Sequence, residues 1–229
     1  MENQLVSWDH IPALLRSARE AGINVYLSGP SSCSKTFSAH ASAETVFSVT
    51  ITREMDSSQL TGYDMPGRGW TPGPVVRAMQ SGSPLVLNEL GLANGDVEAV
   101  CLMACDSPQS IRYTIPSTGE TIRPTAGYHV IATANAPLAT LSAALVDRFV
   151  EVQILGPHPT AYQGLPADLR SAAEAAWLAE PARRRSLRDF LRFAALRDPM
   201  GPLTAAQIVF GPGFQAVLDS LKVASDVQS

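Results

Sequence analysis

Short apolar runs alternate with segments of helical periodicity along the first two thirds of the chain. Ile11, Leu14, Leu15 and Ala18 repeat at the spacing of an amphipathic helix, which Gly22 ends. Further helices are predicted from the segment after Thr36 through Glu44, over 75–80 and over 97–105. Buried strands are predicted at 24–27, 46–52, 85–87, 129–135 and 149–154. This alternation favours an α/β fold in which helices cover both faces of a parallel sheet.

The sequence changes character after Gly156 and Pro157. Beyond this linker it is rich in Ala, Leu and Arg and poor in strand signals, with helices predicted over 167–179, 186–197, 204–210 and 213–224. We therefore expect two domains, an α/β core over 1–155 and an α-helical domain over 156–229.

Two segments of the core interrupt the alternation. The Gly/Pro-rich stretch 61–74 is predicted to have no regular element through most of its length. The stretch 110–123 has hairpin character, with its turn at Thr118 and Gly119.

Composition narrows the class of protein. The 229 residues are 45% hydrophobic and 17% charged, which is typical of a folded globular protein. The net charge of −4 gives the chain as a whole no basic footprint for nucleic acid. No apolar run reaches the roughly 20 residues that a membrane span needs, and the polar N-terminus is unlike a signal peptide, so we expect a cytoplasmic protein. Cys101 and Cys105, one helical turn apart, are interpreted as small core residues.

The segment GPSSCSKT (Gly29–Thr36) lies between a predicted strand and a predicted helix, the context of a phosphate-binding loop. Backbone amides of such a loop cradle the phosphates of ATP or ADP, while Lys35 contacts the β- and γ-phosphates and Thr36 ligates Mg²⁺. Ser34 stands where glycine is usual, and its side chain is expected to cost some affinity. The alternative is a Ser-rich turn before a helix. The predicted nucleotide-binding residues of the loop are Gly29, Ser31, Ser32, Cys33, Ser34, Lys35 and Thr36.

Polar residues follow two of the predicted strands. Glu89, after the third strand, is a candidate base that polarises the attacking water. Asn88 occupies the place where P-loop ATPases normally carry the aspartate that holds Mg²⁺, so we expect weaker Mg²⁺ binding and slower turnover. Asn135, after the fourth strand, can orient the attacking water; alternatively it is a capping or turn residue.

Several motifs together resemble the MoxR-like branch of the AAA+ ATPases, over roughly residues 10–200. This resemblance implies a P-loop AAA+ core with a five-stranded parallel sheet flanked by helices, followed by a small α-helical lid. The matching segments are GPSSCSKT (29–36), QLTGYDMPGRGWTPGPVVRAMQSG (59–82), PLVLNEL (84–90), TGETIRPTAGYHVIATAN (118–135), ALVDRF (144–149) and SLRDFLRFAAL (186–196).

The resemblance also assigns roles. It makes Asn135 the first sensor, Arg148 the arginine finger that reaches a neighbouring subunit's γ-phosphate, and Arg188 the second-sensor arginine of the lid. The alternative for Arg148 is a surface ion pair with Asp147 or Glu151. The alternative for Arg188 is the solvated side of a helix whose core stripe is formed by Leu187, Phe190, Leu191 and Ala194.

The function expected from these features is ATP-driven remodelling of a protein partner by a homo-oligomeric ring, a hexamer by the family resemblance. MoxR-like proteins commonly work with a von Willebrand A-domain partner. Ser34 and Asn88 predict slow turnover. One alternative is a ring component that binds ATP without useful hydrolysis. Another is a nucleic-acid motor, which the acidic net charge disfavours.

Overall fold

The computed structural model describes residues 10–154, 156–157, 159–179 and 185–227. Backbone contacts divide the chain into two units, one of Met1–Pro30 with Lys35–Leu155 and one of Ser31–Ser34 with Gly156–Ser229. Each unit has its own hydrophobic core. No described helix is both long and apolar enough to cross a bilayer.

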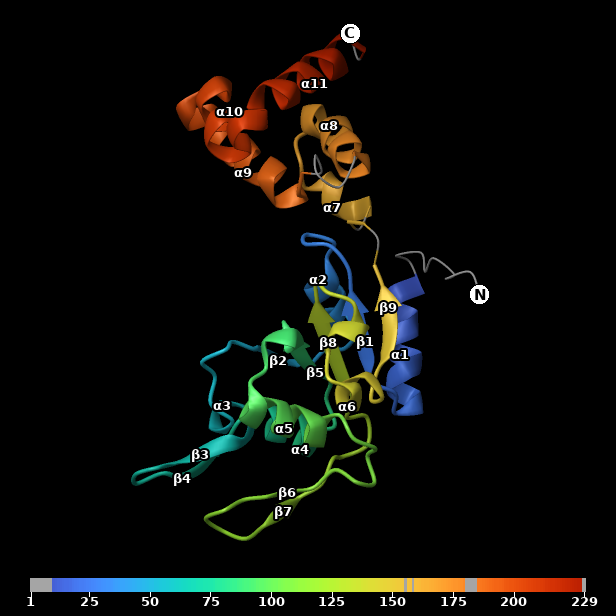
Figure 1. The fold of residues 1–229 in the computed structure, drawn as a ribbon, viewed down its shortest axis with the longest axis vertical. Coiled ribbons are helices and arrows are strands. Elements are labelled where there is room, and N and C mark those ends of the chain that lie inside the picture. Colours follow the sequence, from blue (N-terminus) through green and yellow to red (C-terminus); the bar gives the residue numbers. More distant parts are fainter. Residues whose placement is uncertain (1–9, 155, 158, 180–184, 228–229) are drawn as a thin grey trace. The chain divides into compact units, whose positions relative to one another are not determined.

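A five-stranded parallel sheet forms the centre of the first unit (Figure 1). Its order is β2 (Phe47–Thr50), β5 (Leu85–Asn88), β8 (Val130–Ala134), β1 (Val25–Ser28) and β9 (Val150–Gln153), so all five predicted strands are confirmed. The strands β1, β5 and β8 are buried at every position. This is the pattern of central parallel strands covered on both faces. Because all pairs are parallel, the carboxyl ends of the strands share one edge.

Helices flank the sheet. The amphipathic α1 (Ile11–Ala21) buries Ile11 and Leu15 and ends at Gly22, whose left-handed φ of 67° lets the chain turn. The remaining helical segments of this unit are α2 (Lys35–His40), α3 (Ser58–Thr61), α4 (Pro74–Ser81), α5 (Gly95–Ala104) and α6 (Ala143–Val146), with 3₁₀ turns η2 (Leu90–Leu92) and η3 (Leu138–Thr140).

The predicted helices α4 and α5 are confirmed within a residue or two of their expected bounds. Cys101 and Cys105 are free thiols buried in the core, as predicted. The helix expected to run through Glu44 is shorter, because α2 ends at His40. There the backbone N–H and hydroxyl of Ser42 both donate to the Ala39 carbonyl, at 3.3 and 2.6 Å, so this side chain competes with the next helical turn.

The prediction for 61–74 is wrong. This segment forms an antiparallel hairpin of β3 (Gly62–Met65) and β4 (Gly69–Pro72). Its glycines do not break the hairpin but make it possible. Gly67 and Gly69 adopt φ values of 77° and 74° in the turn, and a Cβ on Gly62 would lie 2.4 Å from the Thr71 carbonyl oxygen.

A second hairpin forms where it was predicted, from β6 (Tyr113–Thr114) and β7 (Thr121–Ile122). Gly119 adopts a φ of 71° in its turn. Trp70 of β4 stacks on Tyr113 of β6, with ring centroids 6.3 Å apart, so the two hairpins lie side by side (Figure 1).

The second unit is helical. The four predicted helices are confirmed as α8 (Ala167–Leu178), α9 (Leu187–Met200), α10 (Pro202–Phe210) and α11 (Phe214–Val227), and the one-turn helix α7 (Pro159–Gln163) was not predicted. A 3₁₀ turn, η4 (Gly211–Gly213), joins α10 to α11.

The core of this unit is centred on three aromatic rings. Phe210 lies 5.4 Å from Phe190 and 5.5 Å from Phe193 between ring centroids. The predicted core stripe of α9 is therefore partly wrong, because Phe193 is buried while Leu191 is 42% exposed. A register of i, i+3, i+6 from Leu187 faces the core instead.

Candidate nucleotide-binding site

The loop that follows β1 has the backbone of a phosphate-binding turn. Gly29 has a φ of 145°, and Ser32 and Ser34 have left-handed φ values of 66° and 60°. Ser34, in the place of the usual glycine, thus keeps the conformation that glycine would adopt. A non-glycine residue in this region costs about 1–2 kcal/mol, so the loop stores strain at the step before Lys35.

Lys35 begins α2 and is only 8% exposed. Its Nζ donates to the carbonyl oxygens of Gly29 and Pro30, both at 2.8 Å, and to Oδ1 of Asn135 at 3.0 Å. The structure therefore brings Lys35 and Asn135 together across a sequence separation of 100 residues. An anionic phosphate can replace these neutral oxygens, because hydrogen bonds between ionised partners are stronger.

Asn88, at the end of β5, is the centre of a buried hydrogen-bond network. Its Oδ1 accepts from Thr36 Oγ1 at 3.1 Å and from Thr133 Oγ1 at 2.8 Å, while its Nδ2 donates to Ser48 Oγ at 3.0 Å. The two predicted Mg²⁺ ligands, Thr36 and Asn88, are therefore direct neighbours. Both side chains offer oxygen atoms, the ligand type that Mg²⁺ prefers, but neither oxygen carries a charge.

Sequence reasoning missed Thr133 and Ser48. Both are hydroxyl residues on the strands that flank β5. Ser48 of β2 is paired with Val86, and Thr133 of β8 is paired with Asn88. A hydroxyl near the carboxyl end of a central strand is the signal that would have found Thr133.

Glu89 follows Asn88 in a strained backbone conformation, with φ 57° and ψ 42°. Its N–H donates to the Thr133 carbonyl at 2.7 Å, which fixes the residue at the edge of the sheet. The side chain is partly exposed, so water can reach the carboxylate. A left-handed non-glycine residue at such a place is typical of functional sites.

Tyr26 supports the loop that carries Asn135, a role that sequence reasoning also missed. The Tyr26 hydroxyl donates to the Ala136 carbonyl at 3.0 Å. Burial, and then the negative charges of Glu151 and Glu89, raise the pKa of Tyr26 to about 12. The hydroxyl therefore stays protonated and remains a donor at all physiological pH values.

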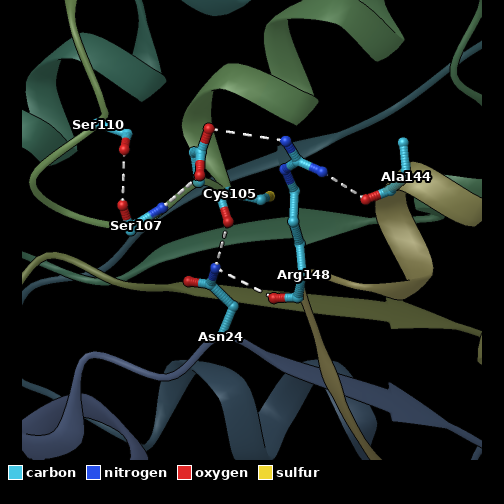
Figure 2. Close-up of polar contacts among 7 residues, drawn as sticks. Asn24, Cys105, Ser107, Ser110, Ala144 and Arg148 are labelled. Atoms are coloured by element: carbon cyan, nitrogen blue, oxygen red, sulfur yellow. Dashed lines mark hydrogen bonds and ion pairs between the residues drawn. The ribbon is translucent and has the colours of Figure 1, made fainter.

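Arg148 lies at the opposite edge of the sheet from these residues. Its carbonyl accepts from Asn24, which precedes β1, whereas the phosphate loop follows β1 (Figure 2). The four residues of β1 separate the two edges by roughly 13 Å at 3.3 Å per residue. The structure thus groups Lys35, Thr36 and the strand-end residues at one edge, and leaves Arg148 apart.

The guanidinium of Arg148 contacts its own chain. Nη1 donates to the Ala144 carbonyl at 2.7 Å, and Nη2 lies 3.6 Å from Oδ2 of Asp106 (Figure 2). The ion-pair partner is therefore Asp106, and neither Asp147 nor Glu151, the two partners considered from the sequence. Arg148 and Asp106 line an open pocket of about 350 Å³ together with Asn24 and Asp147.

Arg188 lies in the first turn of α9, in the helical unit, with an exposed side chain. The helix begins with a capping box, in which Ser186 and Asp189 each bond the other's backbone N–H, at 3.3 and 3.2 Å. The nucleotide contact expected of Arg188 stays a prediction.

The sequence profile of the AAA domain (dynein-related subfamily) matches residues 24–149, more than half of the chain. The chain belongs to this family. The matched region of this AAA domain runs from just before β1 to the residue before β9, and so contains the segment Gly29–Thr36, Glu89, Asn135 and Arg148. The expected membership of the MoxR-like AAA+ ATPases is thereby confirmed.

Two curated relatives are similar to about two thirds of this chain. Protein NorQ of Paracoccus denitrificans (strain Pd 1222) is 30% identical over 158 residues, which are 64% of this chain and 58% of NorQ. The uncharacterized protein YojN of Bacillus subtilis (strain 168) is 29% identical over 167 residues, 67% of this chain and 53% of YojN. The chain spans a little over half the length of these relatives.

Solved structures show the same fold. NtrX from Brucella abortus in complex with ATP superposes with a TM-score of 0.59 at 14% identity, covering 97% of this chain and 69% of that one. A second NtrX structure gives a TM-score of 0.58 at 16% identity over 84% of this chain and 50% of that one. The predicted P-loop AAA+ architecture with C-terminal helices is therefore confirmed.

Proposed function

We propose that this AAA domain binds and hydrolyses ATP as one subunit of a homo-oligomeric ring, and that the cycle remodels a protein partner. One observation carries the proposal. The nucleotide-site residues lie at the carboxyl edge of the sheet, and Arg148 lies at the amino edge of the same sheet, about 13 Å away along β1.

The residues at the carboxyl edge suit phosphoryl transfer to water. The loop amides and Lys35 hold the polyphosphate, and Glu89 takes the proton of the attacking water, which Asn135 orients. Thr36 and Asn88 would hold Mg²⁺, which would supply positive charge beside the phosphates. Because Asn88 carries no charge, the turnover we expect is slow.

Arg148 acts on the nucleotide of a neighbouring copy. The length of β1 separates its guanidinium from the phosphates of its own subunit. Stabilisation of the transition state therefore requires a second chain. A contact that joins one edge of a subunit to the other edge of the next is heterologous, and such contacts close into rings. The resemblance favours a hexamer, with Arg188 touching nucleotide from the lid and a von Willebrand A-domain protein as the partner.

A second candidate function is a ring component that binds ATP without useful turnover. The neutral Asn88 favours it, since its amide carries no charge to attract a cation and its Oδ1 already accepts from Thr36 and Thr133. The net charge of −4 disfavours a nucleic-acid motor, and the absence of salt-dependent DNA binding would exclude it.

Binding and hydrolysis are tested separately. ATP titration of the wild type and of Lys35→Ala should show loss of binding in the variant, whereas Lys222→Ala, which alters the only other lysine of the sequence, should bind normally. Phosphate release that Glu89→Gln abolishes would exclude the passive alternative. Equal retention of ATP by the wild type and by Lys35→Ala would overturn the proposal.

The action of Arg148 on a neighbouring subunit is tested by mixing two inactive variants. Glu89→Gln subunits lack the base but supply Arg148, and Arg148→Ala subunits have a complete site but lack the arginine. Each alone should be inactive, and the mixture should regain hydrolysis. Light scattering with and without ATP would give the number of subunits.

A further inference from the structure

A single side chain, Asn24, holds the main chain around Arg148. Its Nδ2 donates to the carbonyl oxygens of Cys105 at 2.7 Å and Arg148 at 3.3 Å, and its Oδ1 accepts from the Val130 N–H at 2.8 Å (Figure 2). The Asn24 carbonyl also accepts from the Val150 N–H at 3.0 Å. Both N–H groups and the oxygen of the amide are therefore in use, and Asn24 holds the main chain at the Arg148 carbonyl and again at the Val150 N–H, soon after Arg148 in the chain.

The groups that Asn24 joins belong to different elements. Cys105 caps the C-terminus of α5, and the next residue, Asp106, pairs with the Arg148 guanidinium. Val130 begins β8, the strand whose far end leads into Asn135 at the nucleotide site. Asn24 thus connects the backbone of Arg148 to α5 and to the strand that carries the first sensor.

The guanidinium of Arg148 is held by one hydrogen bond within its own segment and by one ion pair. Nη1 donates to the Ala144 carbonyl, four residues earlier in the chain, at 2.7 Å. The ion pair with Asp106 is 3.6 Å long between partly exposed side chains, and such pairs contribute about 0–1 kcal/mol. Within the described part of the chain, Nε of Arg148 is buried and has no hydrogen-bond partner. Because the Ala144 carbonyl belongs to the same segment as Arg148, the direction of this side chain follows the placement of that segment's main chain.

We propose that Asn24 is a positioning residue for Arg148, which sets the arginine at the correct place for the neighbouring subunit's nucleotide. This inference rests on the proposed function, in which Arg148 acts between subunits. Accurate placement matters because a displacement of 1 Å can lower a rate by on the order of 100-fold.

Asn24→Asp tests the two hydrogen bonds that Nδ2 of Asn24 donates. The substitution keeps the shape and the acceptor for Val130, but it replaces the donor by an oxygen that faces the Cys105 and Arg148 carbonyls. Asn94→Asp is the matched control. Asn94 makes the same three kinds of bond at the other end of α5, donating to Arg53 and Met55 carbonyls at 3.1 and 3.0 Å and accepting from the Val97 N–H at 3.0 Å.

Mixed rings show through which subunit Asn24 acts. Asn24→Asp is placed either on the Glu89→Gln subunit, which supplies the arginine, or on the Arg148→Ala subunit, which supplies the site. On the arginine-supplying subunit it should lower the restored kcat by about ten-fold with little change in KM for ATP. On the site-supplying subunit, and for Asn94→Asp on either subunit, activity should stay within about two-fold.

The other outcomes of the mixed-ring experiment each contradict one of the two proposals. Equal losses on both subunits, or no loss on either, would overturn the inference and leave the proposed function intact. A parent mixture that regains no hydrolysis would overturn action between subunits itself. If Asn24→Asp does not fold, Asn24→Ala replaces it, because it removes the same donor without adding a charge: the same fall of about ten-fold confined to the arginine-supplying subunit is expected, and an equal effect on both subunits or none would overturn the proposal.

Discussion

Asn88→Asp is the most informative single substitution, because it restores a negative charge while leaving the geometry intact. Oδ1 can still accept from Thr36 and Thr133 as it does now, at 3.1 and 2.8 Å. The second carboxylate oxygen takes the place of Nδ2, and the Ser48 hydroxyl, now 3.0 Å away, rotates to donate to it. All hydrogen bonds are kept, so the charge is the only large change.

The magnitude follows from two opposing effects. A unit charge near a divalent ion at about 5 Å gains on the order of 6 kcal/mol at an effective dielectric constant near 20. Asn88 is only 8% exposed, and removing a carboxylate from water costs several kcal/mol. The net gain we expect is about 1.4–2.8 kcal/mol, which corresponds to roughly 10- to 100-fold tighter Mg²⁺ binding.

The assay is ATP hydrolysis as a function of Mg²⁺ concentration, with thermal unfolding in EDTA beside it. The half-saturating Mg²⁺ concentration should fall by at least about ten-fold. In EDTA the variant should be less stable than the wild type by about 1–2 kcal/mol, because the buried carboxylate lacks its cation. Asn94→Asp, the same chemical change at the start of α5, is the control. An unchanged Mg²⁺ dependence would refute the assignment of Asn88 to the metal site.

Three further predictions concern strain and burial. Ser34→Gly removes a left-handed serine with φ 60°, so it should raise the free energy of unfolding by about 0.5–1 kcal/mol and tighten ATP binding; unchanged values in denaturant and ATP titrations would contradict this. Burial, and to a smaller extent Arg19, lower the pKa of His129 from 6.5 to about 4. The contribution of neutral His129 to the free energy of unfolding should therefore be fully present above pH 6.5 and fall by about 3 kcal/mol as the pH drops to 4. Urea titrations at each pH should show a smaller fall for His129→Leu. Gly62→Ala places a Cβ 2.4 Å from a backbone oxygen at φ 125°, so it should cost more than about 2 kcal/mol and open the hairpin to proteolysis, whereas Gly67→Ala, with nothing within 4 Å, should cost less.

Local patterns determined much of this protein. Apolar runs located all five strands, and periodicity located the main helices, because both signals depend on residues within one or two turns of each other. The phosphate loop was predicted for the same reason, since Gly29 to Thr36 are contiguous and their chemistry is local. The hairpin over 62–72 was missed because its glycines are needed for close packing, which a local pattern interprets as a break.

Only the tertiary structure determined which polar groups meet. Asn88 bonds Ser48 across 40 residues and Thr133 across 45, and Asn24 bonds Arg148 across 124, so no local pattern could pair them. The ion-pair partner of Arg148, Asp106, was likewise not among its sequence neighbours. The sequence sets the hydrophobic periodicity of each helix and strand. The pairing of the strands decides which strand ends lie at the same edge of the sheet. That pairing is set by burial of the whole sheet, and it placed the nucleotide site and Arg148 at opposite edges.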